Sequence, residues 1–158
     1  MTIFTKLTRE DAFELLELAS KFHQESPFAN KYKFNPESLW ELLDCTLKYP
    51  STNLCVYVKR EGKIIGFLLG HMTEQFCSFV KIAKEQAMYI VPEYRGGTTF
   101  MKMFKVFEQW AKDNKAQEIF IGHSSGIKTE TATSLFPRLG YSLTGYTYNK
   151  ELNNGRSN

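Results

Sequence analysis

The sequence predicts a mixed α/β domain in which a central, mostly antiparallel sheet is flanked by about four helices. Three observations support this fold class. Strand-like segments outnumber amphipathic helical segments, in the order β-α-α-β-β-β-α-β-α-β. The dipeptide Glu61-Gly62 between two apolar runs is a strong hairpin signal. A helix over residues 98–114 separates two further apolar runs, and such a crossover makes its flanking strands a parallel pair.

The first third of the chain predicts one strand and two helices. Residues 2–7 alternate as a short strand, and Thr8 with Asp11 is typical of a capping box that starts a helix. A loop follows over residues 23–34, and Asn35 before a proline begins the second helix. The apolar stripes of the two helices consist of Leu15, Leu16, Ala19 and Phe22, and of Leu39, Leu42, Leu43 and Leu47.

The middle of the chain predicts the main strands of the sheet. Residues 54–60 and 63–72 form the hairpin, and a third strand covers about residues 77–91 with an interruption near 81–84. The helix after it places a run of apolar residues at helical spacing for the core. These are Phe100, Met103, Phe104, Phe107 and Ala111.

The last third predicts the remaining strands and the fourth helix. Residues 118–122 read as a short buried strand, and residues 129–139 as a helix that stops at Gly140, a good helix terminator. Residues 141–150 return as one or two strands. We expect a single domain over residues 1–152, followed by a polar, frayed tail at 153–158.

Composition bounds the function. A 42% hydrophobic and 15% aromatic chain of 158 residues is typical of one packed globular domain. The net charge of +3 is mild, so nucleic acid and membranes are not expected as partners. We expect neither a signal peptide nor a membrane span, because no apolar run in the sequence is long enough to cross a bilayer. The three scattered cysteines read as reduced thiols in the cytoplasm, and neither they nor the three histidines have metal-ligand spacing.

Residues 90–100 are the most informative feature of the sequence. An apolar run ends in a turn at Pro92, and the pair Gly96-Gly97 leads directly into a helix. This arrangement aims a row of backbone N–H groups from a helix N-terminus, which makes a ready anion site. The phosphates of a nucleotide-like cofactor are the natural occupants of such a site.

This stretch resembles the pyrophosphate loop of the GNAT (GCN5-related) N-acetyltransferases. Residues 132–141, ATSLFPRLGY, are similar to the closing Ala-x-x-Leu-Tyr-x-x-Leu-Gly-Phe signature of the family. The order of elements also matches, and residues 23–28 resemble a subgroup of GNAT proteins carried by phages. The resemblance implies an acyl-CoA N-acyltransferase fold with one splayed parallel pair and acetyl-CoA as cosubstrate. It further implies an amine-bearing small molecule or protein as acceptor, and a possible homodimer.

The resemblance also implies the cofactor-binding residues. In this family the strand before the glycines offers backbone groups to the pantetheine arm, and the loop amides bind the pyrophosphate. The matching residues are Tyr89, Ile90 and Val91 in the strand, and Arg95, Gly96, Gly97, Thr98, Thr99 and Phe100 in the loop, with Thr129 where the family often has asparagine. The family pattern is Arg-x-x-Gly-x-Gly/Ala, and this chain departs from it at Thr98 and Phe100.

Acetyl transfer to an amine needs a base for the amine, a donor for the developing oxyanion and an acid for the thiolate. The family's usual acid is the tyrosine of the closing signature, which is Phe136 here. His123 and Glu85 are the candidate bases, and Tyr141 is the candidate donor to the thiolate. Each of them also has a structural interpretation: a surface histidine, a solvated carboxylate and a core tyrosine.

Three functions remain to be weighed at this point. The leading hypothesis is an acetyl-CoA-dependent N-acetyltransferase that uses direct attack by the amine. The alternative is a catalytically weak or inactive protein of the same fold that binds a partner protein, which the displaced glycines, Phe100 and Phe136 favour. A nucleic-acid-binding module has little support, because no clustered basic stripe is present.

Overall fold

The structure, a computed structural model, describes residues 1–122 and 134–150. The chain divides into two compact units, Met1–Ile127 and Lys128–Asn158. The first unit contains a five-stranded sheet in the order β1-β2-β3-β4-β5. Its strands are β1 (Thr2–Phe4), β2 (Asn53–Arg60), β3 (Lys63–Glu74), β4 (Lys81–Ile90) and β5 (Glu118–Phe120). The first four pair in antiparallel fashion and β4 with β5 is parallel, which confirms the predicted mixed sheet.

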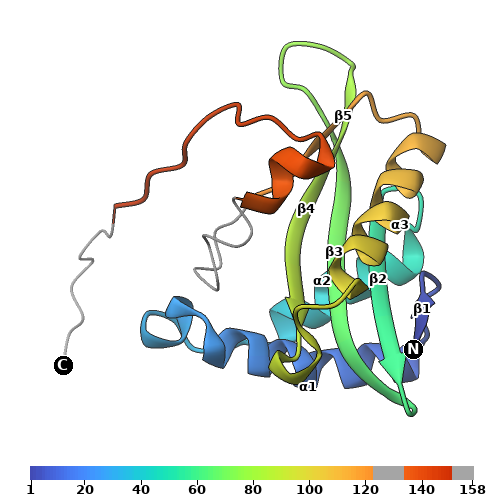
Figure 1. The fold of residues 1–158 in the computed structure, drawn as a ribbon, viewed down its shortest axis with the longest axis vertical. Coiled ribbons are helices and arrows are strands. Elements are labelled where there is room, and N and C mark those ends of the chain that lie inside the picture. The colour runs from blue at the N-terminus through green and yellow to red at the C-terminus, as the bar shows by residue number, and fades with distance from the viewer. Residues whose placement is uncertain (123–133, 151–158) are drawn as a thin grey trace. The chain divides into compact units, whose positions relative to one another are not determined.

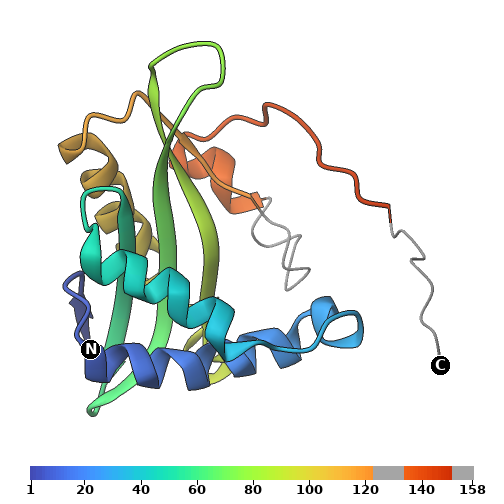
Figure 2. The ribbon, with the colours of Figure 1, turned by 180° about the vertical axis from the view of Figure 1, so that it is seen from behind.

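Three α-helices cover the two faces of the sheet. Helices α1 (Arg9–Glu25) and α2 (Pro36–Lys48) lie on one face, and α3 (Thr99–Asp113) lies on the other (Figures 1 and 2). Short 3-10 helices, η1 (Pro27–Asn30) and η2 (Pro92–Tyr94), follow α1 and β4. None of the helices in residues 1–122 and 134–150 combines the length and the apolar character that crossing a membrane requires.

The predicted helix starts are confirmed by their capping hydrogen bonds. Thr8 Oγ1 accepts from the N–H of Asp11 at 3.1 Å, and Asn35 Oδ1 accepts from the N–H of Glu37 at 2.9 Å. Both bonds satisfy amides that the first turn of a helix leaves without an intrahelical acceptor. The two caps therefore fix where α1 and α2 begin.

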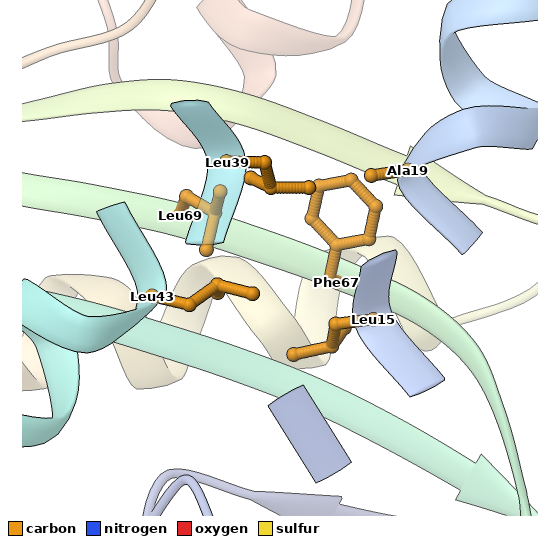
Figure 3. Close-up of a pocket in the computed structure, with 6 residues that line it drawn as sticks. All are labelled: Leu15, Ala19, Leu39, Leu43, Phe67 and Leu69. Carbon is orange, nitrogen blue, oxygen red and sulfur yellow. The ribbon is translucent and has the colours of Figure 1, made fainter. Parts of the chain in front are cut away.

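The core beneath α1 and α2 is closely packed. Its cluster joins Leu15 and Leu43 of the helices to Tyr57, Phe67 and Tyr89 of the sheet. A small, partly open pocket of about 10 Å³ borders it, and Figure 3 shows the six apolar side chains that line it: Leu15, Ala19, Leu39, Leu43, Phe67 and Leu69. Because this pocket is very small and offers no polar group, it is not a substrate site.

The opposite face of the sheet is closed by α3, and Gly70 marks the tightest contact. A Cβ atom on Gly70 would lie 2.6 Å from Cε2 of Phe107, whose side chain is fully buried. Because a buried ring has no room to withdraw, a side chain at this position overpacks the core. The glycine thus allows α3 to approach β3 closely.

We expect Gly70→Ala to lower the free energy of unfolding by about 1–3 kcal/mol, since overpacked core substitutions cost about that much. Chemical denaturation measures the loss. Gly145→Ala is the matched control, because nothing lies within 4 Å of its Cβ position and its φ is not positive. We expect that change to stay within about 0.5 kcal/mol of wild type. Equal stability of the two variants would contradict this description of the α3–sheet contact.

The β2–β3 hairpin is confirmed, with positive φ values at both turn residues, +53° at Glu61 and +80° at Gly62. The predicted interruption of the next strand near residues 81–84 is wrong, because β4 is continuous from Lys81 to Ile90. Residues 75–80 form the turn between β3 and β4, at the end of the long hairpin that projects in Figure 1. Phe76 and Phe79 in this turn are each 94% exposed.

The C-terminal predictions need three corrections or limits. Strand β5 is shorter than residues 118–122 and is not buried, since two of its three residues are exposed. Residues 141–150 form no strand in the described part of the chain. Of the predicted fourth helix, residues 129–133 lie outside the described residues, and the rest is a helical turn followed by η3 (Phe136–Leu139). Its predicted stop is confirmed, because Gly140 ends η3 at φ 86°.

Candidate active site

The two parallel strands separate soon after they meet. Strand β4 pairs with β5 only through Ile82, Ala83 and Lys84, which lie opposite Glu118, Ile119 and Phe120. Strand β4 then continues to Ile90, while β5 has ended. Among the described residues, the edge of β4 over residues 85–90 that faces away from β3 therefore has no strand partner. We call this stretch the open edge of β4.

Strand alternation determines which backbone groups face the open edge. The N–H of Val91 donates to the carbonyl of Ile65 at 2.9 Å, so Val91 faces β3. Alternate residues face opposite neighbours in an antiparallel pair, which directs the backbone groups of Ile90 and Met88 to the open edge. Of the three strand residues predicted to hold the pantetheine arm, only Ile90 faces the opening, while Tyr89 and Val91 face β3. The sequence prediction missed Met88. Residues of a strand alternate between its two edges, and the sequence does not reveal which alternate residues of β4 have backbone groups on the open edge.

The loop after β4 presents a row of amides. Gly96 has a φ of +82°, nothing lies within 4 Å of the Cβ positions of Gly96 and Gly97, and both are exposed. Thr98 is the N-cap of α3 without a side-chain capping bond, and the first amide bonded to it is that of Lys102, at 3.0 Å. The amides of the first helical turn before Lys102 have no acceptor within the helix. Together with the helix dipole they favour an anion such as pyrophosphate.

Three loop residues contribute differently from what the sequence predicted. The N–H of Arg95 donates to the carbonyl of Pro92 at 3.2 Å, so it stays within η2 and outside the amide row. Thr99 is buried and its hydroxyl donates to Sδ of Met1 at 3.2 Å, which leaves its N–H as its contribution. The ring of Phe100 packs on Phe104 with centroids 4.6 Å apart. Its bulk therefore packs along the flank of α3 toward Phe104, and its N–H belongs to the first turn of the helix.

Glu85 lies at the other end of the open edge, beside an irregularity of the strand. Leu69 pairs with Ala87 but Gly70 pairs with Glu85, so Gln86 is an extra residue, a β-bulge. The bulge reverses the alternation: Ala87 packs toward α1 and α2, whereas Glu85 shares the side of Gly70. A bulge thus redirects this carboxyl group away from the face that it would otherwise occupy.

The environment of Glu85 suits acid–base chemistry. Burial raises the pKa of its carboxyl group from an ordinary 4.5 to about 7, although a hydrogen bond from the backbone of Gly122 acts in the opposite direction. A carboxyl group with a pKa near neutrality is partly ionised at the pH of a cell. It is therefore able to accept a proton from an amine and to release it again.

Three further residues were predicted for the site. His123 and Thr129 are outside the described residues. Tyr141 belongs to the second unit, where its ring stands edge-on to that of Phe136 with centroids 6.1 Å apart. The first unit therefore brings together Glu85, the open edge of β4 and the amide row at the start of α3.

Several solved structures with the same fold are named as acetyltransferases. The chain is similar to a ribosomal-protein-alanine N-acetyltransferase from Brucella melitensis biovar Abortus 2308, at 13% identity and a TM-score of 0.70, covering 96% of this chain and 100% of that one. It is similar to AAC(6')-Iy in complex with a bisubstrate analogue, CoA-S-monomethyl-acetylneamine, at 12% identity and a TM-score of 0.75, covering 96% and 98%. A glucosamine-6-phosphate N-acetyltransferase from Arabidopsis thaliana matches at 15% identity and a TM-score of 0.73, covering 96% and 99%. At these identities the likeness defines the fold.

The family itself is established by sequence. The profile of the acetyltransferase (GNAT) family matches residues 13–141. The chain therefore belongs to the GNAT acetyltransferase family, which confirms the predicted family and enzyme class. Comparison with curated protein sequences gave no match.

Proposed function

We propose that this protein is an acetyl-CoA-dependent N-acetyltransferase that acetylates an amine of a small molecule or a protein. One observation carries the proposal: a single open edge of β4 joins an uncapped helix N-terminus to a carboxyl group of raised pKa. From Glu85 to Ile90 this edge spans five steps, or roughly 17 Å of extended strand. The arrangement suits a long ligand with an anionic group at one end and its reactive group at the other.

The residues of the first unit fit the parts of acetyl-CoA in order. The amides of Gly97, Thr98, Thr99 and Phe100 would hold the pyrophosphate, with Gly96 supplying the turn that aims them. The outward N–H of Ile90 and the outward carbonyl of Met88 would bond the amides of the pantetheine arm, as an added strand does at a sheet edge, while the carbonyl of Ile90 already accepts from Nε of Arg95. Tyr89 and Val91 support this edge from the β3 side.

Acetyl-CoA supplies the acetyl group as a reactive thioester, and the protein supplies proton transfer and positioning. Glu85 would accept the proton of the incoming ammonium group, directly or through a water molecule. An outward N–H of the open edge, such as that of Met88, would donate to the carbonyl oxygen as negative charge develops there. The departing thiolate needs a proton, for which Tyr141 is the candidate donor. His123 remains the rival candidate for the base.

An amine acceptor is supported by the names of the structural neighbours. They include enzymes described as acting on ribosomal-protein alanine and on glucosamine-6-phosphate. The acceptor molecules in these names, a ribosomal protein and a sugar phosphate, differ widely in size, although the enzymes share one fold. We therefore propose the amine as the reacting group, which is the chemical feature that these named acceptors share.

Binding of the cosubstrate is tested first by thermal unfolding. We expect saturating acetyl-CoA to raise the Tm by a few degrees, because a ligand that binds only the native state stabilises it by mass action. Adenosine without phosphates is the matched control and should have little effect, since the amide row selects for the anion. An unchanged Tm of the folded protein at millimolar CoA would reject the proposal that acetyl-CoA is its cosubstrate.

Turnover then separates an enzyme from a binding protein of the same fold. Release of free CoA thiol is measured over a panel of amines that includes amino sugars and peptide N-termini. We expect at least one amine to give release above the hydrolytic background. CoA binding without turnover on any amine would favour the partner-binding alternative that Phe136 suggested.

A further inference from the structure

Arg95, the first residue of the family's loop pattern, does not aim its charged group at the amide row. Its Nη1 and Nη2 atoms bond Oε1 and Oε2 of Glu25 at 2.5 and 2.7 Å, a two-pronged ion pair. Its Nε donates to the carbonyl of Ile90 at 2.7 Å, and its guanidinium carbon lies 5.2 Å from the centre of the Tyr89 ring. The Tyr89 hydroxyl also donates to Glu25, at 3.0 Å.

This network connects parts of the chain that are far apart in sequence. Glu25 is the last residue of α1, and Arg95 lies 70 positions later, just before the glycines. The side chains of Arg95 and Glu25 are only 17% and 31% exposed, so solvent screens the pair less than an ordinary surface pair. A carboxylate at the C-terminal end of a helix is opposed by the helix dipole. The ion pair with Arg95 therefore explains why an acidic residue is tolerated there. Arg95 lies in the loop between β4 and α3 that carries the amide row, which we call the cofactor loop.

The same end of α1 also holds the loop between α1 and α2. Ser26 is buried and its hydroxyl donates to the carbonyl of His23 at 2.8 Å. The imidazole Nε2 of His23 is 2.9 Å from the carbonyl oxygen of Tyr32, and its ring lies 5.7 Å from that of Phe34. The last turn of α1 is thus bonded on one side to residues 26–34 and on the other, through Glu25, to the cofactor loop.

We propose that Glu25 is a positioning residue that, through Arg95, sets the conformation of the cofactor loop and couples it to the loop over residues 26–34. The proposal rests on the proposed function, in which the loop that carries Arg95 binds the pyrophosphate, and it adds that the loop over residues 26–34 lies on the acceptor side. Nε of Arg95 also donates to the carbonyl of Ile90, which is the last carbonyl on the open edge. The phosphates are therefore left to the backbone amides, and the arginine serves to hold the loop that carries them.

The test is Glu25→Gln, which keeps the size of the side chain and removes its charge. We expect the Kd for CoA to rise about tenfold, and the KM values for acetyl-CoA and for the acceptor to rise together while kcat changes little. Hydrogen exchange of the amides over residues 96–100, measured without CoA, should become severalfold faster. Glu25→Asp should restore part of both effects. Glu17→Gln, an exposed carboxylate on the same helix, is the matched control and should change neither.

Arg95→Lys keeps the positive charge but loses the two-pronged guanidinium, so it should reproduce the effects of Glu25→Gln. The double variant should show little more loss of CoA affinity, or gain in amide exchange, than either single variant. Wild-type CoA affinity and wild-type exchange in Glu25→Gln would overturn the proposal, as would tighter CoA binding from a released arginine. If the wild type itself fails to bind CoA, the proposed function is rejected. Faster loop exchange in Glu25→Gln would still support the positioning role in that case, and unchanged exchange would remove it.

Discussion

Glu85→Gln is expected to lower kcat/KM for acetyl transfer by roughly 10²–10⁴-fold, the usual contribution of a general base. The substitution keeps the shape of the side chain and an oxygen that can accept the bond from Gly122, but it cannot take up a proton. CoA affinity should change little, because the amide row lies at the other end of the open edge. Steady-state kinetics with an amine identified in the panel, together with CoA titration, measure the two quantities.

The pH profile gives a second signature of the same residue. Because burial raises the pKa of Glu85 to about 7, kcat/KM of the wild type should rise with pH through that value and level off above it. A carboxyl group with an ordinary pKa would give a flat profile between pH 6 and 8. In Glu85→Gln the ascending limb should disappear. His123→Ala is the matched test of the rival base, and a normal limb in Glu85→Gln with loss of activity in His123→Ala would transfer the role to the histidine.

As the pH rises through about 7, the stability of the protein should fall while its activity rises. A carboxyl group whose pKa is raised on folding binds more protons in the native than in the unfolded state between pH 4.5 and about 7. Its contribution to stability is therefore present at low pH and is lost as the pH rises through about 7. At pH 8 the ionised group is buried at a cost, so Glu85→Gln should raise the Tm there. A lowered Tm at pH 8 would indicate that the carboxylate stabilises the fold.

Gly97→Pro is expected to weaken CoA binding by roughly 10–100-fold, which corresponds to losing one hydrogen bond to a charged group. Proline removes the N–H that Gly97 contributes to the amide row. It also restricts the residue before it to extended φ/ψ values, whereas Gly96 has a φ of +82°. Calorimetric titration measures the affinity. Unfolding without CoA should be affected far less, and an equal loss in both would make the glycine merely structural.

Two alanine variants separate backbone strain from ligand binding. Gly96 and Gly62 have nearly the same φ, +82° and +80°, and nothing lies within 4 Å of either Cβ position. Alanine should cost roughly 1–2 kcal/mol of stability at each, because the left-handed conformation disfavours a Cβ atom. Only Gly96→Ala should also weaken CoA binding, since Gly62 lies in the β2–β3 turn. Weaker binding in Gly62→Ala as well would show that the effect comes from strain alone.

Local signals in the sequence predicted much of the fold. The caps at Thr8 and Asn35, the turn at Glu61-Gly62 and the stop at Gly140 act through bonds or φ values within a few residues. The failures concern pairing. The bulge at Gln86 depends on the register between β3 and β4, and the chain over 141–150 alternates like a strand without pairing among the described residues. Strand propensity describes a residue's fit to a neighbouring strand, which the segment alone does not supply.

The candidate site was predictable in its chemistry but not in its geometry. The glycine pair before an apolar helix indicated an anion site, and Glu85 was identified through the resemblance to the GNAT family, from its position before the strand at residues 87–91. The raised pKa of Glu85 and the outward set of backbone groups arise only when the sheet is assembled. The pairing of Glu25 with Arg95 joins residues 70 positions apart, and no periodicity in the sequence relates them.

A crystal structure of the protein with acetyl-CoA tests the central claim most directly. The account predicts pyrophosphate oxygens at about 2.7–3.2 Å from amide nitrogens over residues 97–100, the normal range for such bonds. It predicts the pantetheine arm along the open edge at Ile90 and Met88, with the thioester toward Glu85. Acetyl-CoA bound with its phosphates away from the start of α3, or with its thioester remote from Glu85, would contradict it.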